Sequence, residues 1–146
     1  MPSTHCSIHL HITFATSDRK PWIHPTWRNE LHNYMGGIAN ALGAQSIQIG
    51  GVDDHAHLLL SLKPTLRIAD VVREIKKGSC AWATRYERRF GWQDGYGAFS
   101  VSREHIPRIA AYVRQKEEHH RHVTFQEEYV RWLWQEGIAY DARYLW

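Results

Sequence analysis

The stretch GGVDDHAHLLLSL, residues 50–62, joins two short strands and places two histidines in the second of them. AQSIQIGG (44–51) is expected to be the first strand, ending in a glycine turn, and HAHLLLSL (55–62) its antiparallel neighbour, closed by Pro64. Side chains two apart on a strand point to the same side, so His55 and His57 project together, close enough to share one metal ion. The stretch therefore predicts a β-hairpin that carries half of a metal site.

Histidine pairs of this kind are not rare in the chain, which has three: His9/His11, His55/His57 and His120/His122. With 11 histidines among 146 residues, chance alone supplies roughly one His-x-His, so any of them can consist of ordinary hydrogen-bonded histidines. The first pair has the same strand geometry as the second, and geometry does not separate them. The third lies on a predicted helix, where a spacing of two separates side chains.

The composition predicts a single domain spanning residues 1–146. Hydrophobic residues make up 43% of the chain and aromatic residues 12%, which is enough for a core.

The formal net charge of +3 favours an acidic partner such as nucleic acid without requiring it. Basic charge is concentrated in residues 67–89, which contain seven basic and three acidic side chains. A solvated helix face is the plain alternative for that segment.

Cysteine usage and the first residues point to a reducing compartment. Cys6 and Cys80 are too few and too far apart for a disulfide framework, and no Cys-x-x-Cys pair suggests structural zinc. The stretch MPSTHCSIHLHITF is interrupted by polar residues at every second position, so it is expected to be neither a signal peptide nor a membrane span. We therefore expect a cytoplasmic protein without a membrane segment.

Period-two and helical hydrophobic patterns predict the order of the elements. Gly43 is placed where the first helix would stop, and Thr65 is a plausible N-cap for the second. The elements follow as strand 8–14, helix 26–42, strands 44–51 and 55–62, helix 65–86, strand 98–102, and helices 103–122 and 124–135.

This order is the split βαβ pattern of a ferredoxin-like α/β (α+β) fold with a central antiparallel sheet and additional C-terminal helices. Such a sheet packs its two helices on one face. The other face is expected to be free for a site.

The third predicted helix carries a tyrosine at the border of its buried stripe. That stripe consists of Ile106, Ile109, Ala110 and Val113. Tyr112 falls on its flank, beside Arg108, Lys116 and His119, where a purely structural tyrosine is also common. A metal held by two imidazoles needs at least one more ligand and an open position to act on a phosphate oxygen, and this helix is where we expect that ligand.

Five segments, distributed between residues 50 and 146, resemble the single-tyrosine HUH transposases of the insertion-sequence-200 type, especially the branch that includes the repeat-associated tyrosine transposases. They are GGVDDHAHLLLSL, TLRIADVVREIKKGSCAWA, WQDGYGAFSVS, YVRQKEEHHRHVTFQEEY and GIAYDARYLW. The segments occur in order and with matching spacing. The resemblance is therefore far more specific than the histidine pair alone.

The resemblance implies a chemistry for the residues singled out above. In that family His-hydrophobic-His supplies two ligands to a divalent metal, usually Mg2+ or Mn2+, and a helical tyrosine attacks the DNA phosphodiester. The products are a 5′-phosphotyrosine and a free 3′-hydroxyl. By resemblance, His55 and His57 are the metal ligands and Tyr112 is the nucleophile. Members of the family recognise imperfect hairpins in single-stranded DNA and work as dimers.

One position departs from the family pattern. A glutamine usually stands four residues after the tyrosine as third metal ligand, and here that position is Lys116, which cannot ligate while charged. Gln115, three residues after Tyr112, is the substitute we expect, and Glu117 is a further candidate. Either the ligand has moved or metal binding is weakened.

Binding of DNA is assigned to the second helix and the glycine-rich loop after it. The basic face of that helix offers a track for phosphates, and two loop aromatics could stack on unpaired bases. The residues are Arg73, Lys76, Lys77 and Arg85 on the helix, with Trp92 and Tyr96 in the loop. Aromatic residues beside glycines also serve as ordinary loop anchors.

Together with the family resemblance, the sequence predicts a metal-dependent single-stranded DNA transposase with Tyr112 as nucleophile, and the resemblance implies a homodimer. Two other functions stay open. One is a domesticated hairpin-DNA-binding protein that has lost efficient cleavage, which Lys116 favours. The other is a metal-dependent phosphodiesterase that uses activated water, for which Tyr112 would be dispensable.

Overall fold

The structure is a computed structural model, and it describes residues 3–115 and 125–139. Its elements are β1 (His9–Ala15), η1 (Ser17–Arg19), α1 (Pro25–Ala41), β2 (Gln45–Gly51), β3 (His55–Ser61), α2 (Ile68–Ala83), β4 (Gly97–Ser100), η2 (Arg103–His105), α3 (Ile106–Arg114) and α5 (Phe125–Gln135). None of the helices within these two ranges combines the length and the apolar character that crossing a membrane requires.

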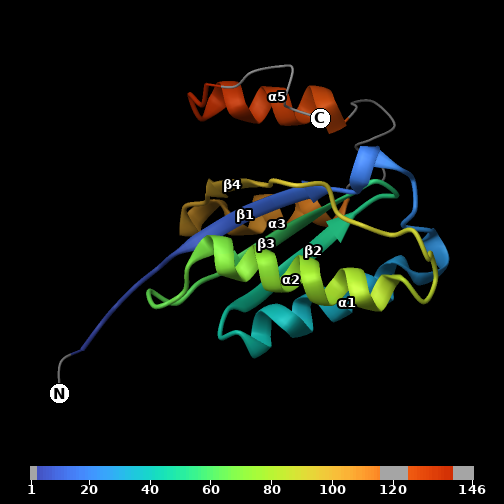
Figure 1. The fold of residues 1–146 in the computed structure, drawn as a ribbon. Coiled ribbons are helices and arrows are strands. Elements are labelled where there is room, and N and C mark those ends of the chain that lie inside the picture. The colour runs from blue at the N-terminus through green and yellow to red at the C-terminus, as the bar shows by residue number, and fades with distance from the viewer. Residues whose placement is uncertain (1–2, 116–124, 140–146) are drawn as a thin grey trace.

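The strands form one four-stranded sheet in the order β2-β3-β1-β4, with every neighbouring pair antiparallel. β1 and β3 lie at the centre, and β2 and β4, which follow α1 and α2, lie at the edges. This is the split βαβ arrangement. The predicted ferredoxin-like fold is therefore confirmed (Figure 1).

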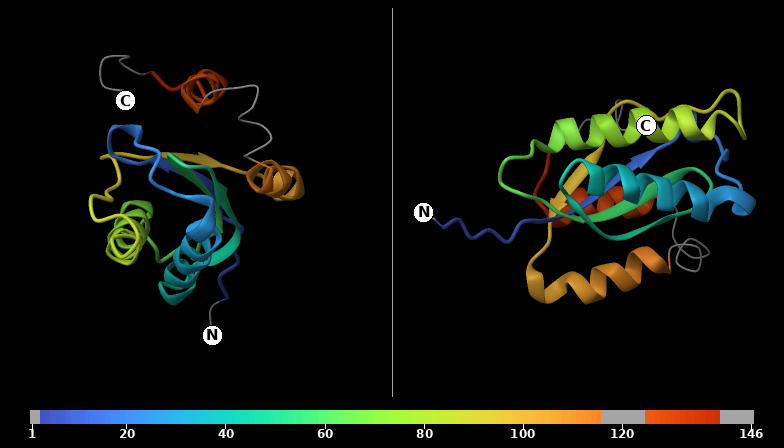
Figure 2. Two further views of the ribbon diagram at one scale, coloured as in Figure 1. Left: turned by 90° about the vertical axis from the view of Figure 1, so that its right-hand side faces the viewer. Right: turned by 90° about the horizontal axis from the view of Figure 1, so that it is seen from below.

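One face of the sheet carries the hydrophobic core beneath α1 and α2 (Figure 2). Alternation along β1 turns Leu10, Ile12 and Phe14 to this side, and alternation along β3 does the same for Ala56, Leu58 and Leu60. From the helices, buried residues at helical spacing complete the core: Trp27, Leu31, Met35 and Ala39 of α1, with Val71, Val72 and Ile75 of α2.

The opposite face is not free, contrary to the expectation from the fold pattern. Figures 1 and 2 show α5 lying over this face and α3 beside it. α3 contacts β2 and β3, and Tyr129 of α5 packs against Gly97 of β4. The C-terminal helices cover the face because their own apolar stripes need a partner, and the sheet offers the remaining one.

The second and third predicted helices are shorter in the structure than expected, with α2 at Ile68–Ala83 and α3 at Ile106–Arg114. The second helix begins at Ile68 with Arg67 as N-cap, and Thr65 lies in the turn before it, so the Thr65 cap was wrong. The third helix ends at Arg114, where Gln115 leaves helical geometry with φ −101° and ψ 23°. Its predicted continuation to residue 122 fails at Gln115, and residues 116–122 lie outside the described part of the chain.

A histidine is buried within α1 on the core side. His32 is buried, and burial together with the nearby Arg28 guanidinium lowers its pKa from 6.5 to about 4. The unfolded chain therefore binds a proton near pH 6.5 that the folded chain does not accept until about pH 4.

We expect acidification from pH 6.5 to about 4 to lower the free energy of unfolding by about 3 kcal/mol through His32, because only the unfolded state is protonated in that range. Urea unfolding of the wild type and of His32→Leu at several pH values measures this. The slope against pH should be shallower in His32→Leu, whereas His5→Gln, at an exposed position, should keep the wild-type slope. Parallel pH profiles for all three proteins would contradict the assignment.

Candidate metal and nucleophile site

Polar side chains are gathered between the sheet and α5, where a core would normally be apolar. The buried ones are His11 and Thr13 of β1, His55 and His57 of β3, and Glu128 of α5. Burying polar and ionisable groups costs free energy unless they are paired. Such a cluster therefore marks a candidate functional site.

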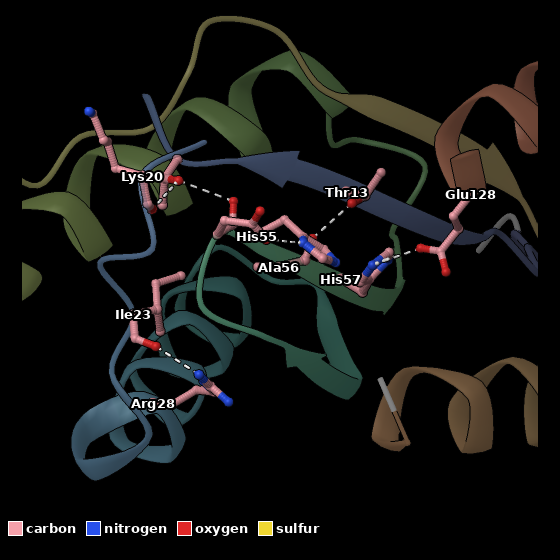
Figure 3. Close-up of polar contacts among 10 residues, drawn as sticks. Thr13, Lys20, Ile23, Arg28, His55, Ala56, His57 and Glu128 are labelled. Carbon is pink, nitrogen blue, oxygen red and sulfur yellow. Dashed lines mark hydrogen bonds and ion pairs between the residues drawn. The ribbon is translucent and has the colours of Figure 1, made fainter. Parts of the chain in front are cut away.

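The position of His55 is fixed by the turn that precedes β3. Its Nδ1 lies 2.7 Å from Asp54 Oδ1. The turn is held in place because the Asp54 carbonyl accepts hydrogen bonds from the backbone N–H and hydroxyl of Thr16, at 2.9 Å and 3.2 Å. Thr13 adds a hydrogen bond from its hydroxyl to the Ala56 carbonyl at 2.9 Å (Figure 3). A carboxylate on one ring nitrogen orients the imidazole and leaves Nε2 as the coordinating atom.

His57 lies between two other members of the cluster. Its Nδ1 is 2.9 Å from Nε2 of His11, and its Nε2 is 3.4 Å from Oε1 of Glu128, toward which the ring points in Figure 3. The first strand pair, which the sequence could not separate from the second, thus contributes one histidine to the same cluster. His11 supports His57, whereas His9 is half-buried at the start of β1.

His55, His57 and Glu128 have the donor set of a divalent-metal site. One ligand atom from each lies within 4.8 Å of the others, and all three residues are buried. Two imidazole nitrogens with one carboxylate oxygen suit Mn2+, Zn2+ or, with added oxygen ligands, Mg2+. The residues therefore fit the metal that the family resemblance implies.

Tyr112 of α3 adjoins this donor set. Its ring centroid lies 6.3 Å from that of His57 and 6.4 Å from that of His11. Burial raises the pKa of Tyr112, and a hydrogen bond to Glu128 and the charge of that carboxylate raise it further. The phenol is thus held protonated beside the histidines.

Trp132 of α5 covers the cluster on the side away from the sheet. Its ring centroid is 4.8 Å from that of His11, 5.4 Å from that of His57 and 5.9 Å from that of Tyr112, with edge-on geometry in each case. The indole limits solvent at the site and fixes the spacing between α3 and the sheet.

Gly50 allows α3 to approach β2 closely enough to deliver Tyr112. It is the register partner of His57, and a Cβ at position 50 would lie 2.3 Å from the Val113 carbonyl oxygen. Only a residue without a side chain fits this contact. The close contact between Gly50 and Val113 therefore positions the helix that carries Tyr112.

The predicted third ligand on α3 is not part of the cluster formed by His55, His57 and Glu128. Gln115 is exposed and forms the C-cap of α3, with its backbone N–H bonded to the Ala111 and Tyr112 carbonyls. Its role as a ligand stays a prediction. Lys116, Glu117 and His119, named beside it, lie outside the described residues, as do His120 and His122.

Two of the predicted DNA-binding residues have structural contacts on the core side of the sheet. Lys76 donates to the Gln93 and Gly95 carbonyls at 2.8 Å and 2.6 Å, and its pKa is lowered mainly by burial. The Trp92 indole donates to the Ser79 hydroxyl at 2.9 Å and packs against Phe14. Both side chains anchor the glycine-rich loop, and contact with DNA would have to compete with these bonds.

The other four candidates are more accessible. Lys77, Arg85 and Tyr96 are exposed, and Arg73 is exposed but forms a 2.9 Å ion pair with Asp70. All are on α2, directly after it, or in the following loop, and α2 covers the face opposite the histidines. Their contact with DNA stays a prediction.

Glu128 and Trp132 were missed from sequence. A usable signal was present, because Glu128 stands four residues before Trp132 on the predicted helix 124–135, within a stripe that includes Tyr129 and Leu133. A carboxylate within an apolar stripe is seldom buried without a partner. The stripe alone does not reveal which sheet residues that partner would be.

A pocket of about 200 Å³ opens beside the cluster, between β4, the start of α3 and the end of α5. Its lining includes His11 and Trp132 from the cluster, with Arg108, His105 and Ser102 at its side. Arg108 stands one helical turn before Tyr112. The pocket thus joins the buried site to a cationic side chain.

Comparisons with known proteins identify the family and the fold. The sequence profile of the family described as "Transposase IS200 like" matches residues 4–116. A candidate transposase from Deinococcus radiodurans R1 is 20% identical, with a TM-score of 0.65 over 80% of this chain and 95% of that chain. A REP-associated tyrosine transposase bound to a REP hairpin is 15% identical, with a TM-score of 0.63 over 97% of this chain and 91% of that one. At these identities the two structures show a shared fold. No curated protein matches the chain.

Gly50→Ala should displace α3 and Tyr112, because the new methyl group overlaps the Val113 carbonyl. We expect a loss of about 1–3 kcal/mol in the free energy of unfolding, measured by urea denaturation. Gly37→Ala is the matched control, since nothing lies within 4 Å of a Cβ there. In the middle of α1 that change should stabilise by about 0.5–1 kcal/mol. Equal effects of the two substitutions would refute the close contact.

Proposed function

Because this chain belongs to the IS200-like transposase family, we propose that it is a metal-dependent single-stranded DNA transposase, cleaving and rejoining DNA through a 5′-phosphotyrosine at Tyr112. The observation that carries the proposal is the convergence of Tyr112 with His55, His57 and Glu128 in one buried cluster. A purely structural tyrosine would not need a carboxylate bonded to its hydroxyl and the rings of His57 and His11 beside its own.

His55, His57 and Glu128 would hold the divalent metal, Mg2+ or Mn2+. When bound, such an ion neutralises the charge that develops on the phosphate oxygens. His11 and Asp54 act as positioning residues. His11 contacts Nδ1 of His57 and Asp54 contacts Nδ1 of His55, so that Nε2 of each ring is directed at the site. Glu128 takes the place of the family's glutamine in this proposal.

The cleavage step balances without an external reactant. The Tyr112 oxygen attacks the phosphorus, a P–O bond to tyrosine forms, and the bond from phosphorus to the 3′-oxygen breaks. The phenol loses one proton and the departing 3′-oxygen gains one. Because bond energy is kept in the phosphotyrosine, a 3′-hydroxyl of another strand can reverse the step and complete strand transfer.

Access to the site requires α5 to move. His55 and His57 are 0% exposed and Glu128 is 2% exposed, so a phosphodiester cannot contact them while α5 covers the sheet. The pocket beside Arg108 offers the entry, since a phosphate bound to its guanidinium would lie one turn from Tyr112.

The proposed partner is a hairpin in single-stranded DNA. The REP-associated transposase of similar fold is bound to a REP hairpin, and the basic side chains on and after α2 suit a phosphate backbone. We further propose action in the cytoplasm, where Cys6 and Cys80 would stay reduced, and a homodimer, which sedimentation would detect.

A domesticated hairpin-binding protein without efficient cleavage is the second candidate. Lys116 favours it, because a lysine replaces the usual glutamine ligand. The two candidates differ in one property: only the transposase forms a covalent bond to DNA.

Covalent trapping tests the chemistry. Labelled hairpins from the flanking DNA are incubated with protein and Mn2+ or Mg2+ and separated on a denaturing gel. We expect a metal-dependent adduct that is absent in Tyr112→Phe and reduced roughly hundredfold or more in His57→Ala. Tyr129→Phe, a second partly buried tyrosine, is the matched control and should keep the adduct.

The other outcomes identify the alternatives. DNA nicking that survives in Tyr112→Phe would show a phosphodiesterase using water. Tight hairpin binding with no adduct in the wild type would leave a DNA-binding protein.

Mn2+ binding, measured by calorimetry without DNA, tests the ligand set separately. Glu128→Gln should weaken Mn2+ binding by at least about tenfold, because a charged ligand is replaced by a neutral amide. Glu127→Gln, on the exposed neighbouring residue, should bind Mn2+ as the wild type does. If Gln115→Ala weakens binding and Glu128→Gln does not, the third ligand is on α3.

A further inference from the structure

Four aromatic rings meet where α1 lies against the end of α2, on the side of the sheet away from the histidines. Trp27 and Tyr86 stack with ring centroids 5.1 Å apart and an interplanar angle of 10°, and Tyr34 and Trp82 stack at 5.6 Å and 22°. Trp82 and Tyr86 join the two stacks at 5.2 Å. The rings form one continuous set that spans both helices.

The outer members of this set are open to solvent. Trp27 is 6% exposed and belongs to the core, whereas Tyr34 is 42% and Tyr86 48% exposed. Tyr34, Trp82 and Tyr86 are called the aromatic platform below. Packing does not require large rings at such open positions, so their presence there calls for another role.

The platform is held in a fixed arrangement. Gly78 brings the helices close together, since a Cβ at that position would lie 2.6 Å from Cδ1 of Ile38. The Tyr86 hydroxyl donates to the Glu30 carboxylate at 3.2 Å. Ring faces that are already ordered lose little conformational entropy when they bind a flat partner.

Basic side chains border the platform. The Arg85 guanidinium carbon lies 5.4 Å from the centroid of the Trp82 ring. Arg88 and Arg89 follow within the next turn and are exposed, and Glu87 lies 3.1 Å from Arg89. Flat aromatic faces beside guanidinium groups are the combination that single-stranded nucleic acids bind, through stacked bases and neighbouring phosphates.

We propose that the aromatic platform binds unpaired bases of single-stranded DNA by stacking, with Arg85 and Arg88 on the adjoining phosphates. This rests on the proposed function in that the ligand is DNA, but it uses none of the residues of the metal and nucleophile site. The two sites lie on opposite faces of the sheet, so the bound DNA passes around the molecule from the platform to the site.

Unpaired bases fit the platform better than a second copy of the chain does. The exposed members are ring faces with polar tips and arginines, and the charge of the arginines matches that of DNA phosphates. Positive charge at the border would also repel the same border of a second copy.

The test compares binding of two DNA probes without metal, so that no cleavage occurs. One is a hairpin whose loop contains a fluorescent adenine analogue. The other is a blunt-ended duplex with the sequence of the same stem and no loop. In Tyr34→Ala/Tyr86→Ala, affinity for the hairpin should fall roughly fivefold or more, with loss of the fluorescence quenching that stacking produces. Affinity for the blunt duplex should change less than twofold.

The matched control is Tyr34→Phe/Tyr86→Phe, which keeps the rings and should bind the hairpin as the wild type does. Circular dichroism and thermal unfolding establish that each variant is folded. The proposal is overturned if the double alanine variant keeps its affinity for the hairpin, or if it loses affinity equally for both probes. It is also overturned if the wild type does not bind the hairpin, or if the substitutions change sedimentation without changing DNA binding. Adduct formation by Tyr112 does not enter this readout, so the platform and the proposed chemistry can fail separately.

Discussion

The antiparallel register between β1 and β3 determines which side chains reach the site. It pairs Thr13 with His57 and His11 with Leu59, so that His11 and His57 lie diagonally on the same face. A slip of one residue would turn the histidines of one strand into the core and its leucines toward α5. The hydrophobic core beneath α1 and α2 prevents this slip, because Leu10, Ile12 and Leu58 must stay inside. The same alternation therefore builds the core on one face and the polar cluster on the other.

The second constraint is the fit of the C-terminal helices to the polar face. α3 approaches β2 at Gly50, and α5 brings Glu128 and Trp132 over the histidines. Contacts with Asp54, His11 and Glu128 give His55, His57 and Tyr112 polar neighbours, which offsets the cost of burial. The same contacts close the site to DNA. Because α5 carries Glu128, one of the three proposed ligands, opening of the site would also remove that ligand.

The basic residues of α2 and the groups proposed for catalysis lie on opposite faces of the sheet. α2 and its basic residues cover the core face, and the histidines, Tyr112 and Glu128 lie on the other. Lys76 is bonded to the glycine-rich loop, so on the α2 side of the sheet the cations available to DNA are the exposed ones on α2 and after it. In the proposed function, recognition of a hairpin and cleavage of a strand would therefore use different surfaces, and one DNA molecule would have to span both.

The order of the elements, the side of β3 on which His55 and His57 project, and the helix that carries Tyr112 all followed from the sequence. Local hydrophobic periodicity and turn residues determine them, and these act over a few positions. Gln115 as third ligand, by contrast, followed from spacing on one helix, and it lies exposed at the end of α3. Only the tertiary structure brought His11 to His57, 46 residues away, and Glu128 to both His57 and Tyr112. Contacts of this kind depend on strand register and on how a separate helix docks, and no local pattern encodes either.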